Sequence, residues 1–389
     1  LKQRRRGYSP AEFVRALVLL HVAGGECLDD IRLLDSDMGL RALLGGCGFP
    51  AANTLGSFLR AFGHREIAAL ARLNAGLANR LLVDQREAAE EAVLDFDSTF
   101  IEADKRDAEK TYKGFRGYNP LLATVDGVEV VLGGLFRDGN AAPGSHAVSF
   151  LRRCLHALPA TVRKVTVRSD SAWYQSAVLD FCHRRGVRFT VTADRNQAVR
   201  RTIRTLRRRG TWERLEPKDP DAGEVAETSY VVGDDPRSPA YRLVICRVPR
   251  DQGDLWEGPY RHAAIITNIE DRSAAEIVRF HRGRGDAENR FKELKGGFGM
   301  DTMPCGDLFA NAAYFQTILL AHNLIQCFKV DALPDAWRPT TIKTLRFRLF
   351  SVAGRVVRHA RRWVLKLPHR YPFFDLFAHA LWEIAYAAP

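Results

Sequence analysis

Disulfide frameworks, membrane-spanning segments and secretory leaders all lack support in this sequence of 389 residues. Its seven cysteines form no C-x-x-C pair, and their odd number predicts free thiols in a reducing compartment. The longest apolar run near the start, VRALVLLHVAGG, is too short to cross a bilayer and contains Arg15 and His21. The KQRRRGYSP segment before it has no apolar region of the signal-peptide kind. We therefore expect a globular protein with an ordinary hydrophobic core.

Acidic residues are missing from one long segment near the C-terminus. From Arg338 to Arg370 there are many lysines and arginines, interleaved with aromatic residues, but no Asp or Glu. Together with the net charge of +12, this segment predicts contact with the phosphates of a nucleic acid. Its candidate contact residues are Arg358, Arg361 and Arg362. The alternative is an ordinary solvated face.

The first 88 residues carry the periodicity of helices, in a chain whose length suits two or three domains. Ser9 as the N-cap, Pro10 at the first helical position and Glu12 at the third predict a capped helix start. A helical module at this end of a basic protein has two interpretations, a DNA-binding unit or a cap packed on the main domain. The sequence leaves both open.

From residue 89 the apolar pattern changes to that of strands. A strand that contains Asp95 and Asp97 is followed by a hairpin with an Asp-Gly turn, a helix, a strand ending at Asp170, a helix and a further strand. This order predicts an α/β fold with a mixed sheet, flanked by helical N-terminal and C-terminal regions. The predicted regions are a helical part at 1–88, a first core part at 89–194, a β-rich insertion at 195–261, a second core part at 262–305 and a basic helical part at 306–389.

Three acidic residues on separate elements are candidates for a metal site. Asp97 and Asp170 lie near the ends of two strands, and Glu288 lies in a helix that directly follows another strand. Ligands gather at the carboxyl ends of strands in α/β sheets, and three carboxylates suit Mg²⁺ or Mn²⁺. Two such ions would serve phosphoryl transfer. Any one aspartate at a strand end has a simpler explanation as a cap, but the conjunction predicts an RNase H-like core.

A second pattern lies in HRGRGDAENRFKELKGG, from His281 to Gly297. As one continuous helix, this segment would place His281, Arg284, Glu288 and Lys295 within an arc of about 60°, because a helix turns about 100° per residue. One carboxylate would then lie between cations. The stripe has two explanations, a functional site or simple charge neutralisation on a solvated helix face.

The ordered set of motifs resembles the DDE transposases of bacterial insertion sequences, in the group named for a Tyr-Arg-Glu-Lys signature. The signature spacing falls on His281, Arg284, Glu288 and Lys295, so His281 stands where that family usually has Tyr. Further matching pieces are LDFDST, KGFRGYNPLLA, RDGN, RSDSAWY, ITN and FRLFSVAGRVVRHARRW. The resemblance spans most of the chain.

This resemblance implies that Asp97, Asp170 and Glu288 form a catalytic triad that binds Mg²⁺ or Mn²⁺ as two ions. Asp95 competes with Asp97 for the first position. Asp97 is preferred because it directly precedes the pair of a small residue and threonine that follows the acid in that family. Asp95 is expected to face the other side of the strand and to be structural.

The resemblance further implies a transposase that binds the terminal inverted repeats of its element as double-stranded DNA. It would cleave a phosphodiester bond at each end and transfer the 3′-hydroxyl ends into target DNA, with His281, Arg284 and Lys295 at backbone phosphates. A homodimer is expected, because two ends must be paired, in the bacterial cytoplasm at the nucleoid. Two alternatives are a non-catalytic DNA-binding protein derived from a transposase and an RNase H-like nuclease that does not join strands.

Three smaller predictions concern DNA contacts. Trp212 or Trp256 in the insertion would stack on an unpaired base at the element end, unless it is buried in the core. The basic helix from Arg200 to Arg209 would follow the DNA backbone. At His281, an imidazole in place of a phenol predicts a clamp that weakens as the pH rises from about 6 to 8, since imidazole loses its charge near pH 6.5. The alternative is that His281 only fills the turn into the helix.

Overall fold

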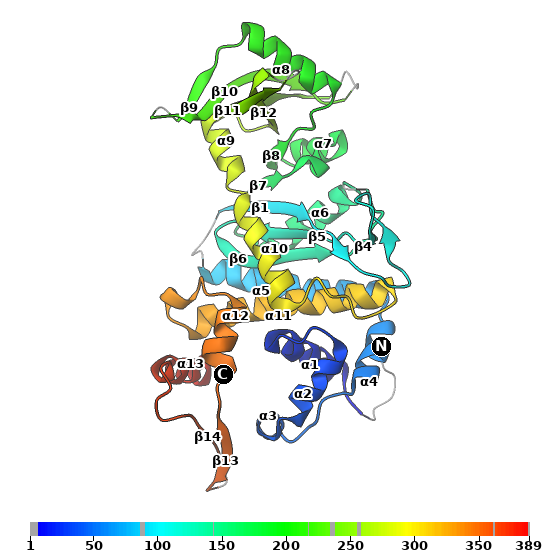
Figure 1. The fold of residues 1–389 in the computed structure, drawn as a ribbon, viewed down its shortest axis with the longest axis vertical. Helices are drawn as coiled ribbons and strands as arrows, with labels where there is room; N and C mark the ends of the chain where they lie inside the picture. The colour runs from blue at the N-terminus through cyan, green and yellow to red at the C-terminus, as the bar shows by residue number, and fades with distance from the viewer. Residues whose placement is uncertain are drawn as a thin grey trace.

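The computed structural model describes residues 7–85, 90–142, 144–216, 218–233, 238–254, 258–360 and 362–387. The molecule is elongated, with the insertion at one end and the N-terminal and C-terminal regions at the other (Figure 1). Ser9 accepts a hydrogen bond from the Glu12 N–H while Glu12 bonds back to it, which confirms the predicted helix start. The N-terminal helices are α1 (Pro10–Ala23), α2 (Ile31–Ser36), α3 (Met38–Leu43), α4 (Ala52–Arg60) and α5 (His64–Gln85), with a 3₁₀ turn, η1 (Leu28–Asp30).

A mixed sheet forms the centre of the molecule. In the described part of the chain its nine strands follow the order β6-β5-β1-β7-β8-β12-β11-β10-β9. They are β1 (Glu91–Ser98), β5 (Leu121–Val125), β6 (Val128–Leu135), β7 (Lys164–Ser169), β8 (Arg188–Thr192), β9 (Glu213–Glu216), β10 (Asp219–Val231), β11 (Ala240–Asp254) and β12 (Gly258–Thr267). The β1, β5 and β6 strands form an antiparallel meander, and β7 and β8 run parallel to β1. This topology confirms the predicted RNase H-like core.

Helices cover both faces of the core sheet. On one face α6 (Ala147–Ala157), η2 (Ser171–Trp173) and α7 (Ser176–Arg184) pack on the sheet, where the Phe96 ring meets Phe150 and Trp173. On the other face, α9 (Ala274–Arg282) and α10 (Gly285–Phe298) cross the strands (Figure 1). Residues two apart on a strand share a face. Alternate side chains of β1 therefore point either into the apolar core beside α6 and α7 or toward α10.

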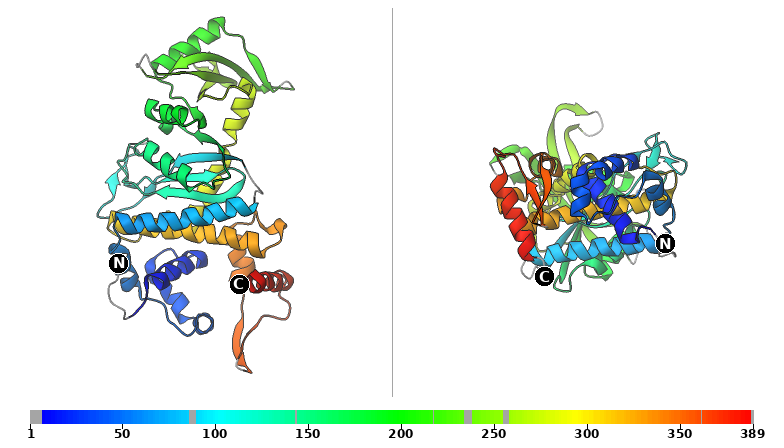
Figure 2. Two further views of the ribbon diagram at one scale, coloured as in Figure 1. Left: turned by 180° about the vertical axis from the view of Figure 1, so that it is seen from behind. Right: turned by 90° about the horizontal axis from the view of Figure 1, so that it is seen from below.

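The longest helix, α11 (Leu308–Ala332), connects the core to the terminal regions. It lies beside α5 below the sheet (Figure 2), and most of its side chains are buried. It contacts β6 and α10 on the core side, and α1, α4 and α13 (Phe374–Ala387) on the other. None of the helices in the described ranges is long and apolar enough to cross a bilayer.

The insertion continues the core sheet. Strand β12 pairs antiparallel with β8, and β11, β10 and β9 follow outward, so the β-rich segment adds strands to the edge that β8 would otherwise leave exposed. The basic helix α8 (Gln197–Arg209) lies at the outer end of the molecule (Figure 1).

The acid-free C-terminal segment differs from the helical expectation. It contains the short helix α12 (Ile342–Leu345) and a π turn, η4 (Arg346–Phe350), but also a hairpin of β13 (Arg355–His359) and β14 (Arg362–Lys366). A 3₁₀ turn, η3 (Asp335–Trp337), precedes them. The valines in this stretch favour strands, and that signal was outweighed by the helical pattern around it.

Candidate active site at the carboxyl ends of β1 and β7

The two predicted aspartates lie side by side at one edge of the sheet. Asp97 is near the end of β1, and Asp170 directly follows β7. These strands are parallel, and Phe96 pairs with Ser169, so the next residue on each strand is the predicted aspartate. Neighbouring strands lie about 4.8 Å apart, which brings the two carboxylates to one place.

The surroundings of Asp170 raise its proton affinity. Burial raises the pKa of its carboxyl, while the charge of Arg284 and the N–H of Ala172 counteract that shift. The Ala172 N–H donates to Asp170 Oδ1 at 3.1 Å and so fixes the carboxylate as the cap of η2. A buried carboxylate with raised pKa favours a nearby cation, which relieves the cost of its charge.

Asp95 is structural, as expected, but the prediction that it faces the other side of the strand from Asp97 was wrong. It lies two residues from Asp97 on a regular strand, so both face the α10 side. The Arg168 guanidinium binds Asp95 through two hydrogen bonds of 2.7 and 2.8 Å and also binds Asp126 at 2.8 Å. Burial by itself would lower the pKa of Arg168, but these two carboxylates raise it. Asp95 is committed to this buried ion pair.

The signature helix is two helices rather than one. The Arg168 Nη1 atom donates to the Phe280 carbonyl at 3.0 Å, and the Arg284 N–H turns to His281 O instead. Gly283 permits this approach, because a Cβ there would lie 2.7 Å from Arg168 Nη1. The predicted single stripe is therefore interrupted between α9 and α10.

The interruption directs Arg284 to the aspartates. Its Nη1 atom lies 3.2 Å from Asp97 Oδ2, with side chains 22% and 17% exposed. The same guanidinium charge counteracts the raised pKa of Asp170, so it is close to both carboxylates. The contact agrees with charge neutralisation, the simpler of the two explanations for the predicted row of charges. The carboxylate that Arg284 neutralises is Asp97, however, and not Glu288.

Glu288 lies in α10, but its side chain is outside the described residues. The backbone position of this helix is well anchored. The buried Arg290 donates to Thr124 Oγ1 and to the Val128 carbonyl, both at 3.3 Å, and it pairs with Glu129. These contacts fix α10 across β5 and β6 on the face that carries Asp97.

His281 contradicts the prediction of a pH-sensitive clamp. It is buried on α9, with Nδ1 3.0 Å from Thr190 Oγ1 and Nε2 2.9 Å from Thr192 Oγ1. Burial, together with the charges of Arg284 and Arg168, lowers its pKa to about 3. The imidazole is therefore neutral between pH 6 and 8, and it cannot gain a proton there for a phosphate contact.

Lys295 and Trp212 make internal contacts. The Lys295 Nζ atom donates to the Phe100 carbonyl at 2.8 Å, and burial lowers its pKa. The indole N–H of Trp212 donates to the Leu206 carbonyl at 3.2 Å, and Arg247 lies 3.9 Å above the ring centre. Base stacking on that face would require Arg247 to move.

The remaining predicted DNA contacts are placed as follows. Arg358 and Arg362 are exposed on the β13–β14 hairpin, and the α8 arginines described for residues 200–208 are exposed. Arg361 and Trp256 lie outside the described residues.

Two charged residues beside the site were not predicted. One is Arg168, which holds Asp95 and bends the signature helix. The other is Asp194, which follows β8 at the same edge of the sheet and whose charge contributes to the raised pKa of Asp170. The signal was available, because Asp194 lies two residues beyond the end of the next parallel strand, at the same edge as Asp170.

The donor set fits a hard divalent cation in part. Asp97 and Asp170 supply adjacent oxygen ligands, which Mg²⁺ and Mn²⁺ prefer. Within the described side chains, which exclude that of Glu288, no group of three or more potential metal ligands is assembled. The charge of Arg284 compensates part of the charge of the two carboxylates.

The fold and the paired strand-end aspartates define an RNase H-like core. The chain matches the family described as transposase DDE domain group 1 over residues 2–389, and it belongs to that family. This is the class that the sequence motifs suggested.

Two solved structures are similar in part. One is a piggyBac transposase synaptic complex with hairpin DNA, at 13% identity and a TM-score of 0.40, over 84% of this chain and 70% of that chain. The other is a Drosophila P element transposase strand transfer complex, at 12% identity and a TM-score of 0.26, over 53% of this chain and 46% of that chain. No curated protein matches the chain in sequence.

Proposed function

We propose that this transposase-family protein binds the two ends of a DNA element, hydrolyses a phosphodiester bond at each end and joins the 3′-hydroxyls to target DNA. The observation that supports the proposal most is the pairing of Asp97 and Asp170 at the in-register carboxyl ends of two parallel strands. Ligand sites gather at such edges in α/β sheets.

Asp97, Asp170 and Glu288 would together hold Mg²⁺ or Mn²⁺. Two such ions, when bound, activate the attacking oxygen and stabilise the leaving oxygen of a phosphoryl transfer. Arg284 lies at the carboxylates, and its planar array of N–H donors suits a phosphate as well as a carboxylate. Its proposed role is to bind a backbone phosphate next to the reacting bond.

The exposed cations of the β13–β14 hairpin would bind DNA away from the reacting bond. Arg358 and Arg362 belong to this surface. Arg361 lies between them in the sequence but outside the described residues. Each lost phosphate contact on duplex DNA reduces the slope of log K against log salt by about 0.9. The double substitution Arg358→Ala and Arg362→Ala should therefore flatten the slope. The matched pair Arg152→Ala and Arg185→Ala, exposed on the α6–α7 face, should leave it unchanged.

We further propose that the protein acts as a homodimer, because two ends must be held together before strand transfer, and that it acts at the nucleoid of a bacterial cytoplasm. A dimer would form on DNA that carries paired ends. Sizing the complex on such DNA by light scattering tests this, and a single protomer on paired ends would contradict it.

The function is tested by selecting bound sites from random DNA and then incubating the recovered duplex with protein and Mg²⁺. The proposal expects metal-dependent cleavage at the edge of the recovered site, followed by joining of the 3′ ends to a second DNA. Binding without cleavage would favour a non-catalytic DNA-binding protein. Cleavage without joining would favour a nuclease.

A further inference from the structure

The segment between β1 and β5 forms a small flap beside the aspartates. It starts two residues after Asp97 and contains β2 (Ile101–Glu102), β3 (Glu109–Lys110) and β4 (Arg116–Tyr118), paired in the order β2-β4-β3. None of the metal-site residues lies in it.

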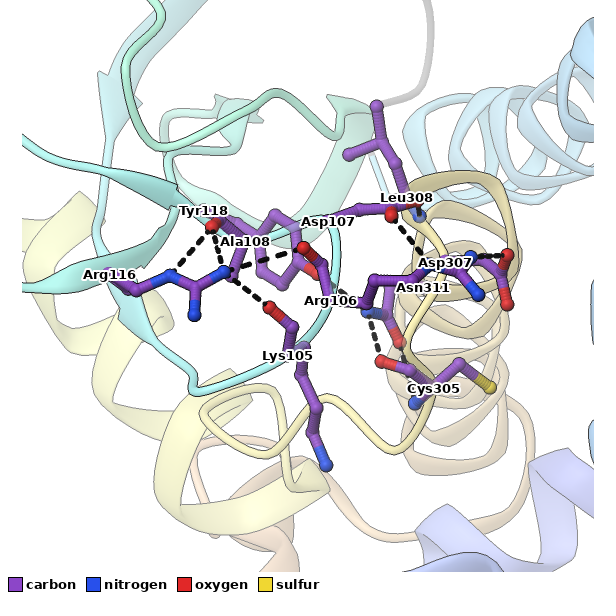
Figure 3. A network of polar contacts seen from close by, with 10 residues as sticks. All are labelled: Lys105, Arg106, Asp107, Ala108, Arg116, Tyr118, Cys305, Asp307, Leu308 and Asn311. Atoms are coloured by element: carbon purple, nitrogen blue, oxygen red, sulfur yellow. Dashed lines mark hydrogen bonds and ion pairs between the residues drawn. The ribbon is translucent and has the colours of Figure 1, made fainter.

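The base of the flap is fixed to the start of α11 (Figure 3). Arg116 donates to the carbonyls of Lys105 and Ala108, each at 2.9 Å, and these bonds hold the flap to itself. Asp107 accepts from the Leu308 N–H at 3.0 Å. Arg106 forms an ion pair with Asp307, and Asn311 donates to the Tyr118 hydroxyl at 3.1 Å. These contacts hold the base of the flap in a fixed position against α11.

A tight turn closes the tip of the flap. The Thr111 N–H and hydroxyl both bond to the Phe115 carbonyl, at 2.8 and 2.9 Å, and Gly114 adopts a φ of +96° that favours glycine. Tyr112 projects from this turn with 71% of its surface exposed. Among the described residues, its ring makes an edge-to-face contact with Phe100, at 5.1 Å between centres and an angle of 81°. A rigid turn therefore presents a largely uncovered aromatic ring.

Two ammonium groups meet at Phe100. The Lys113 Nζ atom of the tip lies 5.0 Å from the centre of its ring, and the Lys295 Nζ atom of α10 donates to its carbonyl. Burial lowers the pKa of Lys295; Asp301 opposes that shift, and the charge of Lys113 adds to it. In the described part of the chain, Lys113 has no carboxylate partner. An anion bound between the two ammonium groups would relieve the repulsion between their charges.

We propose that Lys113 at the tip of the flap joins Lys295, which the family resemblance already places at a backbone phosphate, in holding the DNA strand that ends at the aspartates, and that Tyr112 stacks on an unpaired base next to that phosphate. Phe100 is three residues beyond Asp97, at most about 10 Å of extended chain. With the reach of the Phe100 side chain and the further 5.0 Å from its ring centre to the Lys113 Nζ atom, and at about 3.4 Å per nucleotide, the clamp lies within about six nucleotides of the reacting phosphate. Aromatic rings beside cations are the usual means of holding single-stranded nucleic acid. The inference rests on the proposed function and names a new contact within it.

The test measures binding without metal, so that catalysis does not enter. The probe is a duplex of the selected sequence with an unpaired 3′ end of about six nucleotides carrying 2-aminopurine, compared with the same duplex fully paired. Tyr112→Ala should bind the unpaired end about tenfold more weakly, as expected for loss of one stacked base, and the paired duplex normally. Tyr112→Phe should retain both affinity and the quenching of 2-aminopurine that stacking produces.

Lysine variants test the phosphate clamp. Lys113→Ala should reduce the salt slope for the unpaired end by about 0.7, the value for one contact to a single strand. Lys164→Ala, which removes the same charge at the amino-terminal edge of β7, should leave the slope unchanged.

Equal loss on both probes would overturn the stacking role of Tyr112 and indicate a contact to paired DNA. Wild-type behaviour of Tyr112→Ala and Lys113→Ala would overturn the clamp. The wild-type protein serves as the control for the proposed function. If it binds and cleaves the selected DNA while the variants behave like wild type, the clamp alone is wrong. If the wild-type protein neither binds nor cleaves, the proposed function itself is wrong. Unchanged melting temperatures would confirm that the exposed-tip variants fold.

Discussion

Two arginine–aspartate pairs on one face of the sheet differ in what surrounds them. In the interior, Arg168 binds Asp95 through two hydrogen bonds, with side chains 3% and 0% exposed. At the edge, Arg284 meets Asp97 through one contact of 3.2 Å, and both side chains are partly exposed. The interior pair is closed off from solvent, whereas the edge pair is partly exposed to it.

The comparison shows that position along the strand decides the role. Asp95 and Asp97 have the same side chain, the same strand and the same face, yet one is surrounded by structure and the other lies where the strand ends. Removing one partner of a buried pair is costly, while a partly exposed pair is worth less, and its arginine can be replaced by another cation. The interior pair serves stability, and the edge pair is available for chemistry.

The largest expected effect is on cleavage at the edge. Asp97→Asn and Asp170→Asn should each reduce Mg²⁺-dependent cleavage of the selected site by about 10³-fold or more, because metal stabilisation of the transition state is worth several kcal/mol. DNA binding and the melting temperature should be retained. Gel assays of cleavage and binding on the same preparations check this. Near-normal cleavage by either variant would remove that residue from the metal site.

The next effect is on stability in the interior. Asp95→Ala leaves Arg168 buried with Asp126 as its one remaining charged partner among the described residues, and it should lower the free energy of unfolding by about 3 kcal/mol. Urea denaturation measures this, with Asp97→Ala as the matched control two residues away. If both variants lose the same stability, the distinction between the two pairs fails.

A smaller effect is the dependence of stability on pH. The pKa of His281 is lowered to about 3, as is that of His21, whose burial is the main cause. As the pH falls below about 6.5, the unfolded chain takes up protons that the folded chain does not. Stability should therefore fall by up to about 1.4 kcal/mol per pH unit for each histidine. His281→Gln should show a shallower fall between pH 7 and 5 in denaturation experiments. If wild type and His281→Gln lose stability with the same slope, a group other than His281 is responsible for the pH dependence.

The smallest effect concerns Arg284 as a competitor for the carboxylates. Without DNA, Arg284→Gln should increase the affinity for Mn²⁺ about fivefold, since a partly exposed ion pair is worth about 1 kcal/mol. Electron paramagnetic resonance of free Mn²⁺ measures this. The same variant should bind DNA more weakly if Arg284 also contacts a phosphate. Unchanged or weaker Mn²⁺ affinity would show that Arg284 does not compete.

The core topology and the two aspartates could be predicted because they depend on local pattern. The Asp-Gly hairpin and the alternation of strands and helices specify which residues reach the ends of β1 and β7. The break in the signature helix could not be predicted, since it arises from a contact between Arg168 and Phe280, 112 residues apart. The burial of His281 follows from the same packing, because its partners Thr190 and Thr192 lie on β8.

The face of Asp95 was predictable but was predicted wrongly. The period of two along a strand places it with Asp97, and only the distant Arg168 makes it structural. The hairpin from Arg355 to Lys366 was missed for a different reason. This strand pair has no buried face, so its valines gave a strand signal too weak to outweigh the helical pattern around them.

The most direct test of the metal site replaces its ligands with sulfur. Mg²⁺ demands oxygen ligands, and a transition-metal ion such as Mn²⁺ accepts a thiolate more readily. Cleavage of the selected site should be lost with Mg²⁺ and recovered with Mn²⁺ in both Asp97→Cys and Asp170→Cys, and Asp95→Cys should show no such recovery. Absence of Mn²⁺ rescue at Asp97 and Asp170, or equal rescue at Asp95, would contradict the assignment of the sheet edge as the catalytic site.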